Sequence, residues 1–112
     1  EMYCKTYFDN FNLRTTSLRY FNVYGPFQDP GSEYSAVIPI FITQALANNT
    51  IVINGDGSTS RDFTFIDDVI QANLRAAIST KSDGFVINIA YGESFTLKDL
   101  ANKNRCIIST KA

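Results

Sequence analysis

Two stretches of the chain, residues 13–23 and 84–90, are runs of apolar, aromatic and β-branched residues with little polar alternation. Such continuous runs are typical of strands that are covered on both faces, as in a parallel sheet. A parallel sheet needs neighbouring strands and helices on both sides, and 112 residues leave too few other elements to supply them. The sequence therefore predicts an α/β fold with an incomplete sheet, and we interpret the chain as a fragment of a larger protein.

Helical signals accompany these two strands. Aromatic residues follow one helical face in residues 1–11, which we interpret as the second half of a longer helix. Pro39 fits the first turn of a helix that Asn48 and Asn49 end. Asp67 is a candidate N-cap for the clearest helix of the chain. Four residues are predicted to form the apolar face of that helix, namely Ile70, Leu74, Ala77 and Ile78.

Shorter elements are predicted between and after the helices. Residues 51–53 and 61–66 favour two short strands around a turn that contains Gly55 and Gly57. Thr96 and Asp99 are spaced as a capping pair, which predicts the start of a further helix.

The composition excludes several classes of function. Ten basic and eleven acidic residues give a net charge of −1, so nothing marks a nucleic-acid or membrane surface. The chain has no histidine, and Cys4 and Cys106 lie far apart, which argues against a metal site or a disulfide and suits a reducing cytoplasm. No run approaches the roughly 20 apolar residues of a membrane helix, and no signal peptide opens the chain.

Three blocks of sequence carry a specific resemblance: LRYFNVYGPFQDP at 18–30, YSAVIPIF at 34–41 and NGDGSTSRDFTFIDDVIQAN at 54–73. In order and spacing they resemble the C-terminal half of the extended short-chain dehydrogenase/reductase family, the NAD-dependent epimerases and dehydratases of nucleotide sugars. The resemblance covers about residues 1–100 and is greatest to the UDP-N-acetylglucosamine 4-epimerases of bacterial surface-polysaccharide synthesis. Galactose-type epimerases usually have Pro at the position of Val23, and dehydratases of thymidine-linked sugars tend to have Trp at that of Phe63.

This resemblance implies a partial Rossmann-type parallel sheet plus part of a small substrate-binding domain. Residues 1–25 would end the catalytic-helix region and supply one strand of the cofactor domain, and residues 67–92 would return to that sheet. Residues 26–66 would belong to the substrate domain. Residues 93–112 would begin another substrate-domain helix with an atypical tail, in which Asn104 falls on the face expected to be buried.

The resemblance also implies site residues, each with a structural alternative. The Tyr20-Phe21 backbone would lie beside the nicotinamide, and Asn22 would bind the sugar–diphosphate portion unless it merely ends a strand. Ala36 and Val37 would hold the uracil ring through their backbone, although the residues alone favour core packing ahead of Pro39. Val52 could flank the nucleotide or lie in a plain edge strand, and Gln28 could reach the substrate or only shape a turn.

Arg61 is the strongest candidate for binding the diphosphate. A guanidinium can grip phosphate oxygens through two parallel charge-assisted hydrogen bonds. The alternative is a solvated arginine at the start of a strand. Adjacent residues of a strand point to opposite faces, so Asp62 is not expected to pair with Arg61. Asp67 and Asp68 are interpreted as helix-start residues rather than as an acid–base pair.

The family's catalytic Tyr-x-x-x-Lys pair is not found in the sequence. The residues four positions before the five lysines are Glu1, Ala77, Ser94, Asp99 and Ile107. A glycine-rich dinucleotide turn is also missing, because Ser60 stands where a third glycine would follow Gly55 and Gly57. The isolated chain is therefore expected neither to bind NAD nor to catalyse a reaction.

The resulting hypothesis is a fragment of an NAD-dependent epimerase that inverts carbon 4 of UDP-N-acetylglucosamine-type sugars. The alternatives are a dehydratase, decarboxylase or reductase fragment of the same superfamily, or a non-catalytic nucleotide-sugar-binding module. The parent enzyme is expected to be a homodimer, with the aromatic residues Tyr3, Tyr7 and Phe11 either at the dimer face or in the core.

Overall fold

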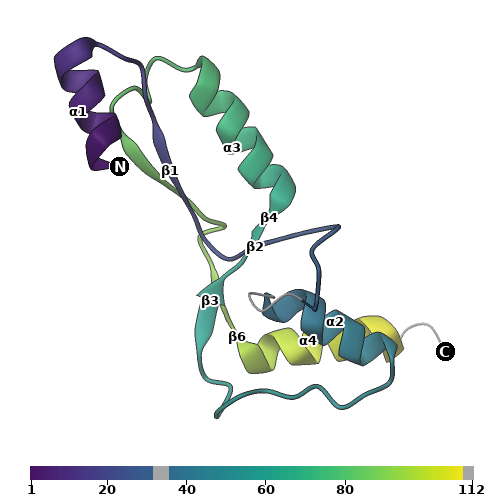
Figure 1. Ribbon diagram of the computed structural model, residues 1–112. Helices are drawn as coiled ribbons and strands as arrows, with labels where there is room; N and C mark the ends of the chain where they lie inside the picture. The colour runs from purple at the N-terminus through teal and green to yellow at the C-terminus, as the bar shows by residue number, and fades with distance from the viewer. Residues whose placement is uncertain (32–35, 110–112) are drawn as a thin grey trace. The chain divides into compact units, whose positions relative to one another are not determined.

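The computed structural model describes residues 1–31 and 36–109, with side chains through Lys103 (Figure 1). The chain divides into two compact units. The first unit comprises Glu1–Val23 and Thr64–Tyr91, and the second comprises Tyr24–Phe63 and the residues from Gly92 on. None of the helices in the described ranges is long and apolar enough to span a membrane.

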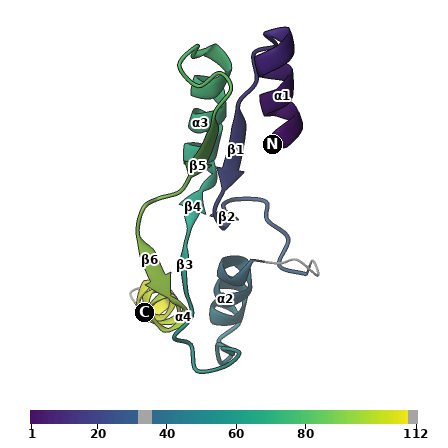
Figure 2. The ribbon, with the colours of Figure 1, turned by 90° about the vertical axis from the view of Figure 1, so that its left-hand side faces the viewer.

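The first unit is built on a pair of parallel strands. β1 (Ser17–Tyr20) pairs with β5 (Val86–Ile89), in a register that aligns Ser17 with Val86 and Tyr20 with Ile89. The helices α1 (Met2–Phe11) and α3 (Ile66–Ile78) lie on either side of this pair (Figures 1 and 2). The predicted α/β class and the predicted parallel strands are confirmed.

The long strand predicted for residues 13–23 is interrupted at Asn22. This residue has a left-handed φ of 33°, a conformation that Asn adopts more readily than most residues do. The chain then enters β2 (Val23–Tyr24), which pairs with β4 (Thr64–Phe65), and the Thr64 N–H donates to the Asn22 carbonyl at 3.3 Å. Two short strands in different sheets therefore replace one continuous strand.

The first unit leaves much of its apolar surface uncovered. In the strand pair, Tyr20 is 48% exposed and Val86 is 42% exposed, so these strands are not buried on both faces within this chain. The prediction of the apolar face of α3 is also wrong. Leu74 and Ile78 are exposed, whereas Val69, which was not assigned to that face, is buried. Uncovered apolar surface is what a partial parallel sheet is expected to leave.

The predicted N-cap of α3 is wrong as well. The helix begins at Ile66, with Phe65 at the N-cap and no side-chain capping hydrogen bond. Asp67 and Asp68 lie instead in the first turn, where negative charges favourably complement the helix dipole.

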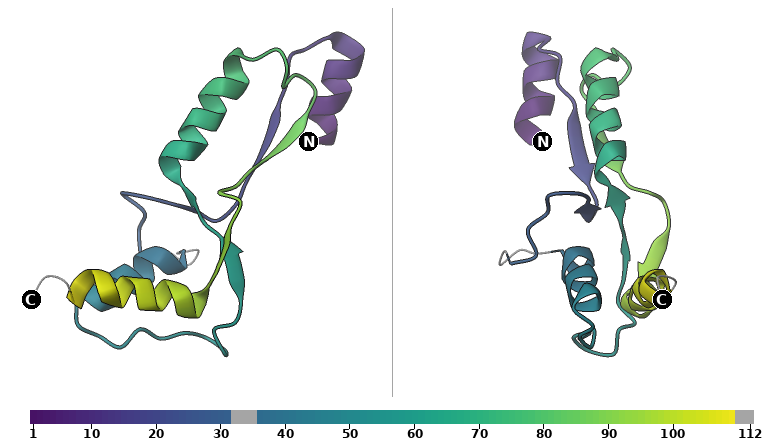
Figure 3. Two further views of the ribbon diagram at one scale, coloured as in Figure 1. Left: turned by 180° about the vertical axis from the view of Figure 1, so that it is seen from behind. Right: turned by 90° about the vertical axis from the view of Figure 1, so that its right-hand side faces the viewer.

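The second unit packs two helices together beside an antiparallel strand pair. α2 (Val37–Leu46) lies along α4 (Leu97–Ser109), and Pro39 is in the first turn of α2 as predicted (Figure 3). β3 (Ser60–Asp62) pairs antiparallel with β6 (Ser94–Thr96). The buried apolar side chains of this unit are Ile38, Phe41, Ala45, Phe63 and Ala101. The side chain of Asn104, predicted to disturb a buried face, lies outside the described residues.

The hairpin predicted for residues 51–66 is wrong. Residues 51–53 form no strand, since the Val52 N–H donates to the Gln44 side chain at 3.3 Å and not to a strand partner. Residues 61–66 are divided among β3, β4 and the start of α3. β3 finds its partner in β6, more than 30 residues further along the chain, so no local sequence signal specified this pairing.

Thr64 offers a test of packing in the first unit. Its side chain is 1% exposed, and its Oγ1 has no hydrogen-bond partner among the residues that the structure describes. Because a buried unpaired hydroxyl costs about 1–3 kcal/mol, we expect Thr64→Val to raise the free energy of unfolding by about 1 kcal/mol in urea denaturation. Thr64→Ser, which keeps the hydroxyl and loses a methyl group, should lower it. A lower stability of the valine variant would contradict the unpaired state.

Candidate functional site

Three predicted site residues lie together where β1 ends in the first unit. The Phe21 N–H donates to the Ile89 carbonyl at 3.2 Å, which extends the pairing with β5 past the end of β1. The Tyr20 hydroxyl donates to Asn73 of α3 at 2.9 Å, and the left-handed Asn22 follows. In parallel sheets, ligands bind at the carboxyl ends of the strands, which is where these residues lie.

Arg61 lies in the middle of β3 in the second unit, with an exposed side chain. Within residues 1–31 and 36–103, its guanidinium makes neither a hydrogen bond nor an ion pair. As predicted, Asp62 does not pair with it, because the Asp62 carboxylate accepts the Gly92 N–H at 2.7 Å. The Arg61 cation therefore extends from a strand that the hydrogen bond of Asp62 to Gly92 helps to anchor.

The connections around β3 fix the position of Arg61. The backbone N–H of Leu97 donates to the Thr59 carbonyl at 3.1 Å, and that of Lys98 donates to the Gly57 carbonyl at 3.3 Å. These bonds tie the start of α4 to the loop and to the residue just before β3. The strand that carries Arg61 is thus held both by β6 and by the helix that follows β6.

The predicted capping pair forms the corner between β6 and α4. The Thr96 hydroxyl donates to Oδ2 of Asp99 at 2.6 Å, and the Asp99 N–H donates back to Thr96 Oγ1 at 3.1 Å. The Thr96 hydroxyl and N–H lower the pKa of the Asp99 carboxyl, and the charge of Lys103 adds to this shift. Asp99 is therefore a charged structural cap and not a proton donor at neutral pH.

The turn before β3 is closed by a second carboxylate. Asp56 accepts hydrogen bonds from the Ser58 hydroxyl at 2.7 Å and from its N–H at 3.0 Å, and these bonds lower the Asp56 pKa. Gly55 and Gly57 have φ of 81° and 71°. The glycines are required by the turn, which agrees with the interpretation of this motif as a turn.

The remaining predicted residues lie elsewhere in the second unit. Ala36 is the N-cap of α2 and Val37 its first residue, where backbone N–H groups are free of helical partners. Val52 is 62% exposed and is tied to α2 through Gln44. Gln28 lies in the loop after β2 with its Oε1 atom buried. No hydrogen bond among the described residues joins these positions to Arg61.

Two residues beside Arg61 were not predicted. Phe95 of β6 is the cross-strand partner of Arg61, and the Nζ atom of Lys103 lies 4.1 Å from the Phe95 ring centroid. No local pattern indicates them, because β6 was not predicted and its register with β3 is a long-range feature.

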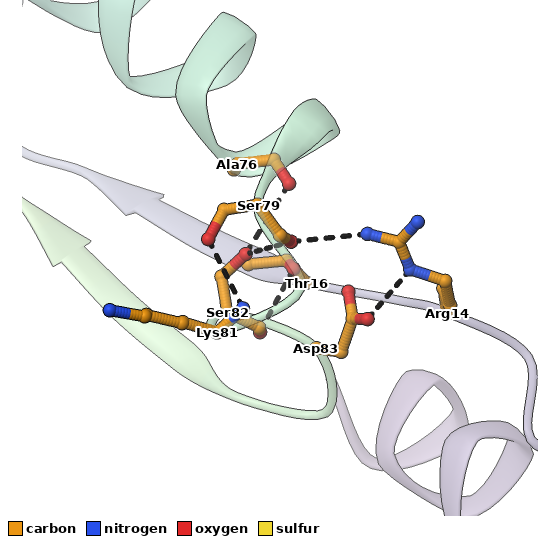
Figure 4. A network of polar contacts seen from close by, with 7 residues as sticks. All are labelled: Arg14, Thr16, Ala76, Ser79, Lys81, Ser82 and Asp83. Carbon is orange, nitrogen blue, oxygen red and sulfur yellow. Dashed lines mark hydrogen bonds and ion pairs between the residues drawn. The ribbon is translucent and has the colours of Figure 1, made fainter.

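A polar network in the first unit serves the fold. Arg14 binds Oδ2 of Asp83 at 2.6 Å and the Ser79 carbonyl at 3.2 Å, and the Thr16 hydroxyl donates to the Ser82 carbonyl at 3.0 Å (Figure 4). Of the lining of a cavity of about 390 Å³, this network supplies Arg14, Thr16 and Asp83, and α3 supplies Asn73. The network joins the residues just before β1 to the segment between α3 and β5. No group of three or more potential metal ligands lies in the described part of the chain.

Comparison with known proteins defines the class of protein. The model of the NAD-dependent epimerase/dehydratase family matches residues 1–90, and the chain belongs to this family. The UDP-glucose 4-epimerase of Mycolicibacterium smegmatis is 37% identical over 100 residues, which are 89% of this chain and 31% of that protein. The UDP-N-acetyl-alpha-D-glucosaminuronate decarboxylase of Bacillus cytotoxicus is 38% identical over 89 residues, or 80% of this chain and 27% of that protein.

A solved structure supports the same placement. The chain is similar to a UDP-N-acetylglucosamine 4-epimerase from Methanobrevibacter ruminantium in complex with UDP-N-acetylmuramic acid, with a TM-score of 0.84 and 43% identity. The match covers 91% of this chain and 32% of the epimerase. The chain thus spans about a third of the length of the relatives that it matches.

Proposed function

We propose that this chain supplies the sugar-nucleotide-binding part of an NAD-dependent UDP-sugar 4-epimerase. The substrates would be UDP-N-acetylglucosamine and its 4-epimer, for use in surface-polysaccharide synthesis. The observation that carries the proposal is the exposed Arg61 guanidinium, which has no partner among the described residues and stands on an anchored strand. A guanidinium that has no anionic partner in the described part of the chain, and that extends from an anchored strand, is suited to a phosphate ligand.

The other predicted residues would complete the site in the intact enzyme. The second unit would act as the substrate domain, with Ala36, Val37 and Val52 around the nucleotide and Gln28 near the sugar. Asn22 would bind the sugar–diphosphate portion, and its left-handed turn at the end of β1 sets its side chain apart from the strand pattern. Alanine substitution of Asn22, Gln28 or Val52, with calorimetric titration of the sugar nucleotide, tests the roles of these three side chains.

The cofactor site would be shared with sequence outside this chain. When bound, NAD would take a hydride from carbon 4 of the sugar and return it to the opposite face. The partly exposed Tyr20 and Phe21, at the carboxyl end of a parallel strand, fit one wall of such a site. The chain has neither a glycine-rich turn nor a Tyr-x-x-x-Lys pair. We therefore propose that alone it binds sugar nucleotide without turning it over.

The intact enzyme is proposed to form a homodimer through the helix that α1 represents. In this chain Tyr3 is 82% exposed and Phe11 is 71% exposed, and the Tyr7 and Phe11 rings lie 5.3 Å apart. This aromatic face does not belong to the core of the first unit. A second copy of the enzyme would cover it.

A second candidate function follows from one comparison. The similarity to a UDP-N-acetyl-alpha-D-glucosaminuronate decarboxylase is as strong as that to the epimerase of M. smegmatis. The same uridine and diphosphate contacts would serve a parent enzyme that acts on a different sugar. Comparing UDP-N-acetylglucosamine with UDP-N-acetylglucosaminuronate as ligands of this chain distinguishes the two candidates, because the two differ only at carbon 6 of the sugar.

Titration calorimetry of the purified chain with UDP-N-acetylglucosamine tests the proposal. We expect Arg61→Ala to weaken binding by about 10- to 100-fold, since hydrogen bonds to a charged group contribute about 1.5–3 kcal/mol. Arg61→Lys should recover only part of the affinity, because an ammonium cannot form the two parallel bonds of a guanidinium.

Arg75→Ala is the matched control, since it removes an exposed arginine from the last turn of α3. It should leave the affinity unchanged, and circular dichroism should show the same secondary structure in all three variants. Equal affinities of the Arg61→Ala and Arg75→Ala variants would refute the assignment of Arg61 to the diphosphate.

A further inference from the structure

Phe95 and Arg61 project from the same face of the two-stranded sheet of the second unit. They are direct partners in the antiparallel register of β3 and β6. Directly opposite residues in such a pair have Cβ atoms about 4.5–5.5 Å apart, close enough for their side chains to interact. The Phe95 ring is therefore the nearest large cross-strand neighbour of the Arg61 stem.

Lys103 brings a second cation to this ring. It lies on α4, and its Nζ atom is 4.1 Å from the Phe95 ring centroid, well within the range of a cation–π interaction. The π-face attracts the ammonium and holds it at a defined place beside β6. Phe95 is thus the cross-strand partner of Arg61 and the ring contact of Lys103, two cationic residues that are 42 positions apart in sequence.

Neither cation forms a hydrogen bond or an ion pair in the described part of the chain, although the charge of Lys103 acts on the Asp99 carboxylate. Within residues 1–31 and 36–103, Lys103 makes no hydrogen bond or ion pair, as is also true of Arg61. Asp99, one turn before Lys103 on α4, directs its Oδ2 atom to the hydroxyl and N–H of Thr96. Two cations that border one residue repel each other weakly, and an anion that both can reach would offset this repulsion.

We propose that Lys103 is the second cation of the diphosphate site, with Phe95 as the residue that positions its ammonium. The inference rests on the proposed function, because it assigns Arg61 and Lys103 to the same ligand. The diphosphate of a sugar nucleotide carries two negative charges, and Arg61 compensates one of them. Lys103 contributes a point charge and Arg61 a bidentate contact, so the two side chains supply complementary parts of one anion site.

Calorimetric titration with UDP and with uridine, at several NaCl concentrations, tests Lys103 directly. Lys103→Met keeps the length of the stem and removes the charge. We expect the Kd for UDP to rise about fivefold, as for the loss of one exposed charge contact, and its dependence on salt to weaken. Binding of uridine, which has no phosphate, should not change. Lys103→Arg restores a charge and should bring the affinity for UDP back toward that of the unaltered chain.

Two comparisons separate this inference from the proposed function. Lys81→Met removes an exposed lysine of the first unit and should bind UDP as the unaltered chain does. If Arg61→Ala weakens UDP binding whereas Lys103→Met does not, the role of Lys103 is refuted and the proposed function stands. If neither variant weakens it, the diphosphate site itself is wrong. Phe95→Leu tests whether Phe95 acts by positioning Lys103. It should weaken UDP binding by no more than Lys103→Met does, and the double variant should bind UDP about as weakly as Lys103→Met alone.

Discussion

Gly84→Ala is expected to lower the free energy of unfolding by about 2–5 kcal/mol. Gly84 has a φ of 76°, and an L-residue in the left-handed region costs about 1–2 kcal/mol. A Cβ atom would also overlap the ring carbons of Phe8, and overpacking of this kind adds about 1–3 kcal/mol. The backbone cannot move away freely, because the Gly84 N–H donates to the Thr15 carbonyl at 2.6 Å.

Urea denaturation followed by circular dichroism measures this loss, and Gly55→Ala is its control. Gly55 has a φ of 81°, but a Cβ atom there would meet nothing within 4 Å. The control should therefore lose only the backbone contribution, about 1–2 kcal/mol. The double variant Phe8→Ala with Gly84→Ala removes the overlap and should show a smaller loss than the sum of its single variants. Equal losses in the two glycine variants would show that the Phe8 contact does not matter.

Local signals in the sequence were sufficient for the elements that depend on nearby residues. The capping pair of Thr96 and Asp99 starts α4, and Pro39 lies in the first turn of α2. Both effects act within a single helical turn. The two apolar runs were correctly interpreted as parallel strands, because uninterrupted hydrophobicity distinguishes that environment from a half-exposed sheet.

Elements whose formation depends on partners far away in sequence could not be predicted from the sequence. β6 was missed, and residues 51–53 were wrongly predicted as a strand, since strand pairing is decided by a partner far away in sequence. The face of α3 was misjudged because the helix has apolar residues on more than one side. Val69 is buried whereas Leu74 is exposed, and only tertiary packing makes that choice.

The candidate site follows the same division. Arg61 was predicted to bind the diphosphate because its motif is local, and the structure adds that its guanidinium makes no hydrogen bond or ion pair with the described residues. Phe95 and Lys103 enter the proposed site only through the register of β3 with β6 and the first two turns of α4. The sequence motif alone therefore indicates one cation of the proposed site, and the fold is needed to indicate the second.

Phe41→Ala is expected to cost the second unit about 3–5 kcal/mol of stability, the range for removing a buried phenylalanine. Phe41 is 2% exposed and lies on the inner face of α2 with Ile38 and Ala45, one turn away on either side. α2 packs along α4, and removing the buried ring would leave a cavity in this unit. Because α4 also carries Lys103, loosening this contact should weaken UDP binding as a secondary effect.

Ile42→Ala separates core packing from the general effect of truncating a residue of α2. Ile42 is the next residue of the helix and is 42% exposed, so its loss should cost about 1 kcal/mol, or roughly the area that it buries. Denaturation in urea gives both values, and hydrogen exchange of the α2 and α4 amides should increase far more in the Phe41→Ala variant. Similar losses in the two variants would mean that α2 does not pack through the Phe41 face. The packing of α2 against α4 also holds the helix that carries Lys103. The Thr96–Asp99 cap joins that helix to β6, which carries the Phe95 ring that Lys103 contacts.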